Sequence, residues 1–359
     1  MSERTRPAPE ARFWQTESDG RILCTLCPRY CRLAEGQAGF CFIRQNQSGV
    51  LRSLGYGRPT GFAVDPIEKK PLNHFLPGSA ILSFGTAGCN LGCRFCQNWD
   101  MSKAKVDELH SQNVTPEEVV DLAQRESCPA IAYTYNDPII IGEFVIDVAH
   151  IARERGIRSV MVTNGYITPE ARTEVFREID GVNIDLKGFT EEFYKKLTHS
   201  RLQPVLDTMI WLGRETDIWF EITTLLIPGY NDSEEEIRRE CAWVLENLGD
   251  GVPMHFTAFH PDYKMTDVPR TPASTLLRAR ELAMEVGVKF VYVGNVFDDE
   301  GQTTWCPGCG AALIERDWHS VRANHLQGDR CPKCAAVIPG RFEEVTRGSS
   351  SGPRRVRPR

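Results

Sequence analysis

The sequence predicts an α/β fold around a parallel β-sheet, either closed as a full or partial barrel or open as a doubly wound sheet. Two observations predict it. Short apolar runs rich in β-branched and aromatic residues recur between residues 80 and 298, and helix-start signals fall between them. Strands that alternate with helices pair in parallel, because each helix returns the chain to the same end of the sheet. We therefore expect the active site at the carboxyl ends of the strands.

Seven runs have the length and composition of strands. The first, AILSFG, is uninterrupted by polar residues larger than serine, as expected for a strand covered on both faces. The runs are residues 80–85, 130–135, 159–164, 182–188, 220–227, 254–259 and 289–294.

Helix starts are marked by capping residues. Residues 115–118 (TPEE) combine an N-cap threonine, a proline at the first helical position and a capping-box glutamate. Threonine–proline pairs at 168–169 and 271–272 repeat the first two signals, and Ser233 precedes three glutamates. Helical patterns also cover residues 139–155 and 202–215.

The composition limits the classes of function. A net charge of −6 over 359 residues argues against broad electrostatic binding to nucleic acid. No apolar stretch approaches the roughly 18 residues of a membrane helix, and the first residues lack the apolar core of a signal peptide. We therefore expect a soluble, cytoplasmic protein that binds neither a membrane nor nucleic acid.

Thirteen cysteines are many for such a chain, and all but Cys128 and Cys241 fall in three clusters. Clustering in a long chain without an export signal favours metal ligation over disulfides. The two isolated cysteines are expected to be buried structural residues.

The clusters and the strand pattern predict five regions. A flexible N-terminus covers residues 1–20 and a cysteine-rich module residues 21–75. The sheet domain covers residues 76–300. A zinc-ribbon-like module covers residues 301–342, and a Ser/Gly/Pro/Arg tail, predicted to be disordered, covers 343–359.

The strongest motif is GTAGCNLGCRFCQNW at residues 85–99, where Cys89, Cys93 and Cys96 follow the first strand at C-x3-C-x2-C spacing. Three thiolates satisfy three irons of a [4Fe–4S] cluster and leave the fourth iron open. An open iron can chelate the amino and carboxylate groups of S-adenosylmethionine (SAM), and one electron then splits a carbon–sulfur bond to give a 5′-deoxyadenosyl radical. The alternatives are a three-ligand zinc site or three structural cysteines.

With this loop, further motifs resemble a known family. The chain resembles the AmmeMemoRadiSam-system radical SAM enzymes, which are related to pyruvate formate-lyase activating enzymes, over about residues 20–342. The resemblance implies a partial (β/α)6 barrel with the cluster and SAM at its mouth, and a low-potential electron donor such as flavodoxin or ferredoxin. The motifs are LCPRYC, DPIEKKPLNHF (65–75), GCNLGCRFCQNW, YTYNDP (133–138), VTNGY (162–166), NIDLKGF (183–189), IPGYND (227–232), HFTAFHPDYKM (255–265), VYVGN (291–295) and the terminal CPGC and CPKC pairs.

The resemblance also suggests SAM contacts at the first strand ends. Asn136 and Asp137 stand where activating enzymes carry a Gly-Gly-Glu stretch that receives the SAM amino group. Asn164 resembles the asparagine of a TNG motif that lines the SAM site. The alternatives are a plain turn at Asn-Asp-Pro and an Asn-Gly turn.

Later strands carry polar residues at alternating positions, which face one side of a strand. Asp185 and Lys187 are one such pair, in which the lysine suits the SAM carboxylate; the alternative is an internal ion pair. Glu221, predicted to bind the cofactor, shares a face with Thr223.

Three further residues are candidates near the last strands. His255 and His260 flank the sixth strand and are either catalytic groups or hydrogen-bonded core residues. Asn295 is expected, by resemblance, to contact adenine. No catalytic residue beyond the cluster is assigned.

The outer cysteines form two sets of four. Cys306, Cys309, Cys331 and Cys334 have the C-x2-C…C-x2-C spacing of a zinc ribbon, with a rubredoxin-like iron site as the main alternative. Cys24, Cys27, Cys31 and Cys41 are spaced C-x2-C-x3-C-x9-C and suit either zinc or an auxiliary iron–sulfur cluster.

The sequence thus predicts a radical SAM enzyme that abstracts a hydrogen atom, as a glycyl-radical activase or on a small-molecule, peptide or tRNA substrate. The second hypothesis is an iron–sulfur electron-transfer or metal-dependent interaction protein without SAM chemistry. The seven predicted strands favour the enzyme, because a carrier needs no large barrel.

Overall fold

The computed structural model describes residues 8–109, 111–343 and 353–358. Its centre is a nine-stranded sheet with the order β13-β12-β11-β10-β9-β8-β7-β6-β17. Strands β7 to β13 are parallel and follow one another along the chain, whereas β6 and β17 pair antiparallel at one edge. The strands are β6 (Thr60–Pro66), β7 (Ala80–Gly85), β8 (Ala130–Tyr133), β9 (Arg158–Thr163), β10 (Gly181–Asp185), β11 (Trp219–Leu226), β12 (Met254–Ala258), β13 (Val291–Gly294) and β17 (Arg354–Arg355).

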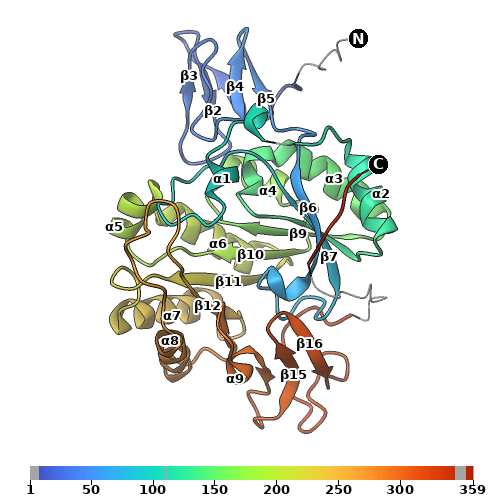
Figure 1. Cartoon of the computed structure of the whole chain (residues 1–359), viewed down its shortest axis with the longest axis vertical. Helices are drawn as coiled ribbons and strands as arrows, with labels where there is room; N and C mark the ends of the chain where they lie inside the picture. The colour runs from blue at the N-terminus through green and yellow to red at the C-terminus, as the bar shows by residue number, and fades with distance from the viewer. Residues whose placement is uncertain (1–7, 110, 344–352, 359) are drawn as a thin grey trace.

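Helices connect the parallel strands and cover the sheet (Figure 1). Each predicted strand run overlaps one of β7 to β13, which confirms the α/β class. Within the described residues, no helix is both long enough and apolar enough to cross a membrane. The helices are α1 (Trp99–Ser102), α2 (Pro116–Arg125), α3 (Gly142–Glu154), α4 (Pro169–Val175), α5 (Glu191–Phe193), α6 (Gln203–Glu215), α7 (Glu234–Leu248), α8 (Ala273–Val286) and α9 (Asp299–Gln302), with shorter turns η1 (Ile67–Lys69), η2 (Val106–Glu108), η3 (Pro138–Ile141) and the π-helical η4 (Tyr194–Thr198).

Two of the four predicted helix caps are confirmed. Thr115 and Ser233 accept hydrogen bonds from the amides three residues on and cap α2 and α7. Thr168 precedes α4, but its hydroxyl donates instead to the Thr25 carbonyl at 2.6 Å. Thr271 likewise donates to the Leu226 carbonyl, and α8 begins one residue later than predicted. These two threonines join neighbouring elements, a use that a capping pattern does not reveal.

Two small modules lie at opposite ends of the molecule (Figure 1). The N-terminal module holds a three-stranded antiparallel sheet and a hairpin, and the C-terminal ribbon holds another three-stranded sheet. The N-terminal strands are β1 (Trp14–Thr16), β2 (Ile22–Cys24), β3 (Arg32–Leu33), β4 (Arg44–Gln47) and β5 (Val50–Ser53). The ribbon strands are β14 (Thr304–Trp305), β15 (Ala312–Asp317) and β16 (Ser320–Asn324).

The predicted boundaries need three corrections. Strand β6 extends the central sheet, so the sheet domain begins before residue 76. Residues 8–16, predicted to be flexible, are held in place; the Arg12 amide donates to Glu143 at 2.7 Å. Residues 354–355 of the tail pair with β6, because an edge strand offers unpaired backbone groups that need no apolar partner. Residues 1–7, 344–352 and 359 lie outside the described residues.

Candidate functional site

The three central cysteines lie on the loop after β7. The Leu91 amide donates to Cys89 Sγ at 3.4 Å, and Cys96 Sγ lies 3.1 Å from Ser102 Oγ. Burial raises the pKa of the Cys93 thiol to about 11. The Cys93 thiol therefore stays protonated at neutral pH unless a bound cation stabilises the thiolate.

A cavity of about 520 Å³ opens beside this loop, a size typical of small-molecule sites. Its wall runs from the cysteines across the carboxyl ends of β8 to β13 and reaches the ribbon. Most of the predicted site residues therefore meet in one place, whereas Glu221 and His260 lie outside the wall. The predicted residues that line the cavity are Cys89, Cys93, Cys96, Asn136, Asp137, Asn164, Asp185, Lys187, Thr223, His255 and Asn295.

Asn136 and Asp137 hold neighbouring loops together. Asn136 Oδ1 accepts from the Thr86 amide at 3.1 Å, and its side-chain amide donates to the Gly88 carbonyl at 2.5 Å. The Asp137 carboxylate accepts from the Asn164 amide at 2.8 Å, while burial raises its pKa to about 6. These are the contacts of the turn that was the alternative to a SAM contact.

Asn164 fixes the cysteine loop against the end of β9. Its Nδ2 donates to Asn90 Oδ1 at 2.8 Å, and Asn90 Nδ2 donates to the Tyr166 carbonyl at 3.0 Å. Sequence reasoning missed Asn90, which follows Cys89 directly. A single asparagine carries no spacing signal, so only the fold reveals that it links the two loops.

Lys187 and Asp185 form the internal ion pair that was the alternative to a SAM contact, with Nζ 2.7 Å from Oδ2. Burial alone would lower the pKa of Lys187, but Asp185 and the nearby cysteine sulfurs raise it above its ordinary value, so the ammonium stays charged. Both side chains line the cavity. Because an ammonium has three donors, Lys187 can bind a second anion while it remains paired.

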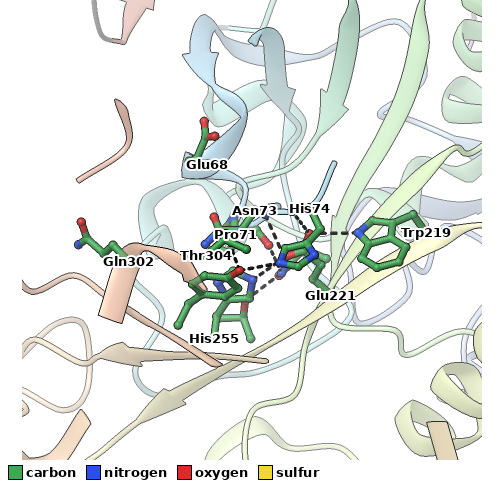
Figure 2. Close-up of polar contacts among 12 residues, drawn as sticks. Glu68, Pro71, Asn73, His74, Trp219, Glu221, His255, Gln302 and Thr304 are labelled. Carbon is green, nitrogen blue, oxygen red and sulfur yellow. Dashed lines mark hydrogen bonds and ion pairs between the residues drawn. The ribbon is translucent and has the colours of Figure 1, made fainter. Parts of the chain in front are cut away.

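Glu221 is fully buried and is not among the residues that line the cavity. Figure 2 shows its carboxylate in contact with neighbouring polar groups, His74 and His255 among them. Its carboxylate accepts from the amides of Asn73 and His74 at 2.9 and 2.7 Å and lies 2.7 Å from His255 Nε2. Burial tends to raise the pKa of Glu221, but the contact with His255 outweighs it and lowers the pKa. Glu221 therefore positions His255, which lines the cavity, instead of making the predicted cofactor contact.

The two remaining candidates differ in position. Asn295 lines the cavity at the end of β13, and its Nδ2 donates to the Ala258 carbonyl at 3.2 Å. His260 is exposed, and its Nδ1 contacts only the Pro261 carbonyl at 3.2 Å. Of the two histidines that flank β12, only His255 is placed to meet a bound molecule.

The ribbon contributes to the cavity, which sequence reasoning did not foresee. Trp318 and His319, at the turn between β15 and β16, line it. Lys69 and Lys70, at the η1 turn that follows β6, line it as well. The motif DPIEKKPLNHF contains both lysines, but its spacing gives no indication that they face the strand ends. The cavity is therefore walled by segments more than 200 residues apart in the sequence.

Comparison with known proteins identifies the family. Residues 84–241, which contain the cysteine loop, match the family model described as the radical SAM superfamily. The chain belongs to the radical SAM superfamily. An uncharacterized protein of Methanocaldococcus jannaschii is 45% identical over 331 residues, covering 92% of this chain and 98% of that protein, so the two share a family.

Two relatives are activating enzymes. The pyruvate formate-lyase-activating enzyme of Clostridium pasteurianum is 23% identical and covers 50% of this chain and 80% of its own length. The pyruvate formate-lyase 1-activating enzyme of Escherichia coli K12 is 23% identical and covers 60% of this chain and 93% of its own length. Together with the family match, these relatives make this chain a radical SAM enzyme.

The central loop of this radical SAM enzyme suits a cluster better than a single ion. Among the described residues, the four C-terminal cysteines are the one group of potential metal ligands whose ligand atoms all lie within 4.8 Å of one another. Cys89, Cys93 and Cys96 do not form a group of this kind. A cluster does not require one, because each cysteine binds a different iron, and the cavity leaves room beside the loop for the open iron.

The ribbon cysteines have the opposite geometry. Cys306 Sγ lies 3.5 Å from Cys334 Sγ, and Cys309 Sγ lies 3.7 Å from Cys331 Sγ. A tetrahedral zinc ion with Zn–S bonds of about 2.3 Å spaces its sulfurs about 3.8 Å apart. The ribbon therefore fits a single tetrahedral metal ion.

The N-terminal cysteines share one site, but no three of them fall within the 4.8 Å limit that the ribbon meets. Burial raises the pKa of the Cys27 thiol, and charge on Cys24, Cys41 or Cys31 would raise it further, which shows that the four thiols are close enough to interact. The Cys24 amide donates to the Cys31 carbonyl at 3.0 Å. Like the central cysteines, and unlike those of the ribbon, these four do not form a group of ligand atoms gathered around one point among the described residues.

Proposed function

We propose that this radical SAM enzyme reductively cleaves SAM at a [4Fe–4S] cluster bound by Cys89, Cys93 and Cys96, and that the resulting 5′-deoxyadenosyl radical abstracts a hydrogen atom from a substrate. The observation that carries the proposal is the cavity, which combines the three thiols of the central loop with polar strand-end residues. The cluster supplies the electron that splits the carbon–sulfur bond.

The residues of the chain orient SAM and exclude water. We assign the SAM carboxylate to Lys187, which keeps donors free while paired with Asp185. Asn295, at the end of β13, is assigned to the adenine. Asn136, Asp137 and Asn164 hold the loops that form the site and contact SAM only through atoms not used in those bonds.

The test is anaerobic reconstitution followed by reduction with dithionite in the presence of SAM. We expect 5′-deoxyadenosine and methionine by mass spectrometry, and loss of both in Cys93→Ala. The matched control is Cys128→Ala, because Cys128 is buried but lies far from any cysteine cluster in the sequence. A reconstituted cluster that never yields 5′-deoxyadenosine would instead favour an electron-transfer protein.

For the hydrogen donor we propose a protein glycine, by analogy with the two activating enzymes. The test uses an extract of the source organism grown on doubly deuterated glycine and divided by ultrafiltration. We expect deuterium in 5′-deoxyadenosine from the protein fraction alone, and none with Cys93→Ala. Deuterium that comes only from the small-molecule fraction would contradict a protein substrate.

A further inference from the structure

We propose that Cys24, Cys27, Cys31 and Cys41 bind a second iron–sulfur cluster, which accepts electrons from a reduced carrier protein and passes them to the central cluster. The second half of this proposal rests on the proposed function, whereas the metal assignment does not. Three independent observations carry it: the spacing of the thiols, the contact between the two cysteine loops, and the exposed surface around the quartet.

The first observation is the contrast between the two outer quartets. The ribbon sulfurs stand at the spacing of one tetrahedral ion, whereas among the described residues the N-terminal quartet does not form a group of ligands gathered in this way. The central loop, whose family assignment implies a cluster, does not form one either. The quartet also offers four thiolates and no open position, which suits a cluster that carries electrons but binds no substrate.

The second observation is direct contact between the quartet and the central loop. A Cβ atom on Gly88 would lie 2.0 Å from the Cys41 carbonyl oxygen, so these two backbones touch one residue away from Cys89. Arg29, between Cys27 and Cys31, donates to the Asn90 carbonyl at 2.5 Å and the His199 carbonyl at 2.7 Å. Each loop therefore fixes the position of the other.

This contact sets a short path for electrons. One step along the chain, about 3.8 Å between Cα atoms, separates Gly88 from Cys89. Because electron transfer weakens steeply with distance, two clusters joined by touching backbones are placed to exchange electrons. A zinc ion has no accessible second oxidation state, so it could not pass electrons to the central cluster along this path.

The third observation is the surface over the quartet. Tyr30, Phe40 and Phe42 are each between 37% and 39% exposed, and they flank the ligands Cys31 and Cys41 in the sequence. The guanidinium of Arg29 lies 3.4 Å from the centre of the Phe40 ring. Exposed aromatic and arginine side chains are typical of the centre of a protein interface.

The charge of this segment suggests the kind of partner. Residues 24–44 contain three arginines and one glutamate, but Arg44 is buried against Glu143 and Arg32 pairs with Glu17, so the positive charge left beside the exposed aromatic side chains is that of Arg29. The complementary partner is an acidic one-electron carrier of low potential, of the flavodoxin or ferredoxin type. One electron from the reduced carrier reduces the quartet cluster, which then reduces the central cluster, and that electron breaks the bond between sulfur and C5′ of SAM with release of methionine.

The metal assignment is tested in a variant that lacks the central ligands, Cys89→Ala/Cys93→Ala/Cys96→Ala. After anaerobic reconstitution we expect about four irons and four sulfides per chain to remain, with the Mössbauer signature of a [4Fe–4S] cluster. Adding Cys24→Ala and Cys27→Ala should remove that iron, while retained ribbon metal shows that the chain still folds. A triple variant that holds zinc at the quartet and no iron would overturn the assignment.

The relay is tested by comparing two reductants in Cys24→Ala/Cys27→Ala. SAM cleavage driven by reduced flavodoxin should fall by about tenfold or more relative to cleavage driven by dithionite, which reaches the central cluster directly. Equal losses with both reductants would overturn the relay. If the wild-type protein cleaves no SAM with either reductant, the proposed function fails, but the iron content of the triple variant still decides the metal assignment.

Discussion

The two flanking modules are each fixed to the sheet domain by one buried arginine, and the two arginines differ in how their charge is compensated. Arg44 in β4 donates to both carboxylate oxygens of Glu143 in α3, at 2.8 and 2.9 Å. Arg316 in β15 donates mainly to neutral oxygens, the Asn73 carbonyl at 2.7 Å and the Thr304 hydroxyl at 2.8 Å. The nearest carboxylate to Arg316, that of Glu68, is 3.6 Å from its Nε.

This difference indicates that the N-terminal module depends on a paired charge and the ribbon on a network of neutral hydrogen bonds. Both arginines are about 2% exposed, so desolvation opposes both charges to a similar degree. The contact of Arg44 Nη1 with both carboxylate oxygens of Glu143 offsets that cost directly. Glu68 offsets less of the desolvation cost of Arg316. Burial raises the pKa of Glu68, and its Oε2 has no partner among the described residues.

The largest expected effect is at the N-terminal junction. Glu143→Gln leaves the Arg44 charge buried without an anion and should lower the free energy of unfolding by about 3–5 kcal/mol. Urea titration of the reconstituted protein measures it. Glu17→Gln, which removes the partner of the exposed Arg32, is the control and should cost less than about 1 kcal/mol. Equal losses in the two variants would contradict the distinction.

The next effect is at the ribbon. Arg316→Met removes the donor to the Asn73 carbonyl and one of the two contacts of the Thr304 hydroxyl, which keeps Tyr292; the change should cost about 2–3 kcal/mol. Because the loss is confined to this junction, hydrogen exchange should increase in β15 and β16 and stay unchanged in β4 and β5. Faster exchange in β4 and β5 as well would show that the two junctions are coupled.

Acid should weaken the ribbon junction through His74, which lies 2.7 Å from the Pro339 carbonyl and 2.6 Å from the Tyr292 hydroxyl. Burial lowers its pKa from 6.5 to about 4. The stability that the neutral imidazole contributes is therefore present above pH 6.5 and is lost as the pH falls through 4, by about 1.4 kcal/mol per pH unit.

The measurement is the urea midpoint of the wild-type protein and of His74→Gln between pH 7 and pH 5, with the metal content followed at each pH. The variant should be less stable at pH 7 and show a flatter dependence on pH. Parallel curves for the two proteins would exclude His74 as the titrating group.

The smallest effect is expected for Glu68→Gln, the counterpart of the first substitution. The 3.6 Å contact with Arg316 is weak, and a glutamine can still accept from the Gly78 amide, so the change should be less than about 1 kcal/mol. A loss as large as that in Glu143→Gln would show that both arginines depend on a carboxylate.

Much of the fold was predictable because its signals are local. The apolar runs located β7 to β13 to within a few residues, and spacing alone separated the cysteine clusters. Strand β6 was not predicted. Its first half is partly exposed and its second half is buried, so apolar and polar residues do not alternate regularly along it. The two-residue strand β17 has no apolar signal at all.

The sequence predicted most of the residues that line the site, but not the role of each of them. Strand-end position brought Asp185 and Lys187 to the cavity, as parallel pairing requires, whereas His255 reaches it from the second residue of β12. The role of Glu221 depends on amides of Asn73 and His74, which lie almost 150 residues earlier. A contact between residues so far apart in the sequence leaves no periodic pattern in either segment, so the three-dimensional structure is needed to find it.

Strand β17 has a practical consequence for anyone who handles this protein. Its two residues cover the free edge of β6 through backbone pairing, and Arg354 adds an ion pair with Glu126 at 2.8 Å. A truncated chain, or one whose end is pulled away by a C-terminal affinity tag, would present that edge to another copy and invite edge-to-edge aggregation. Purification tags therefore belong at the other terminus.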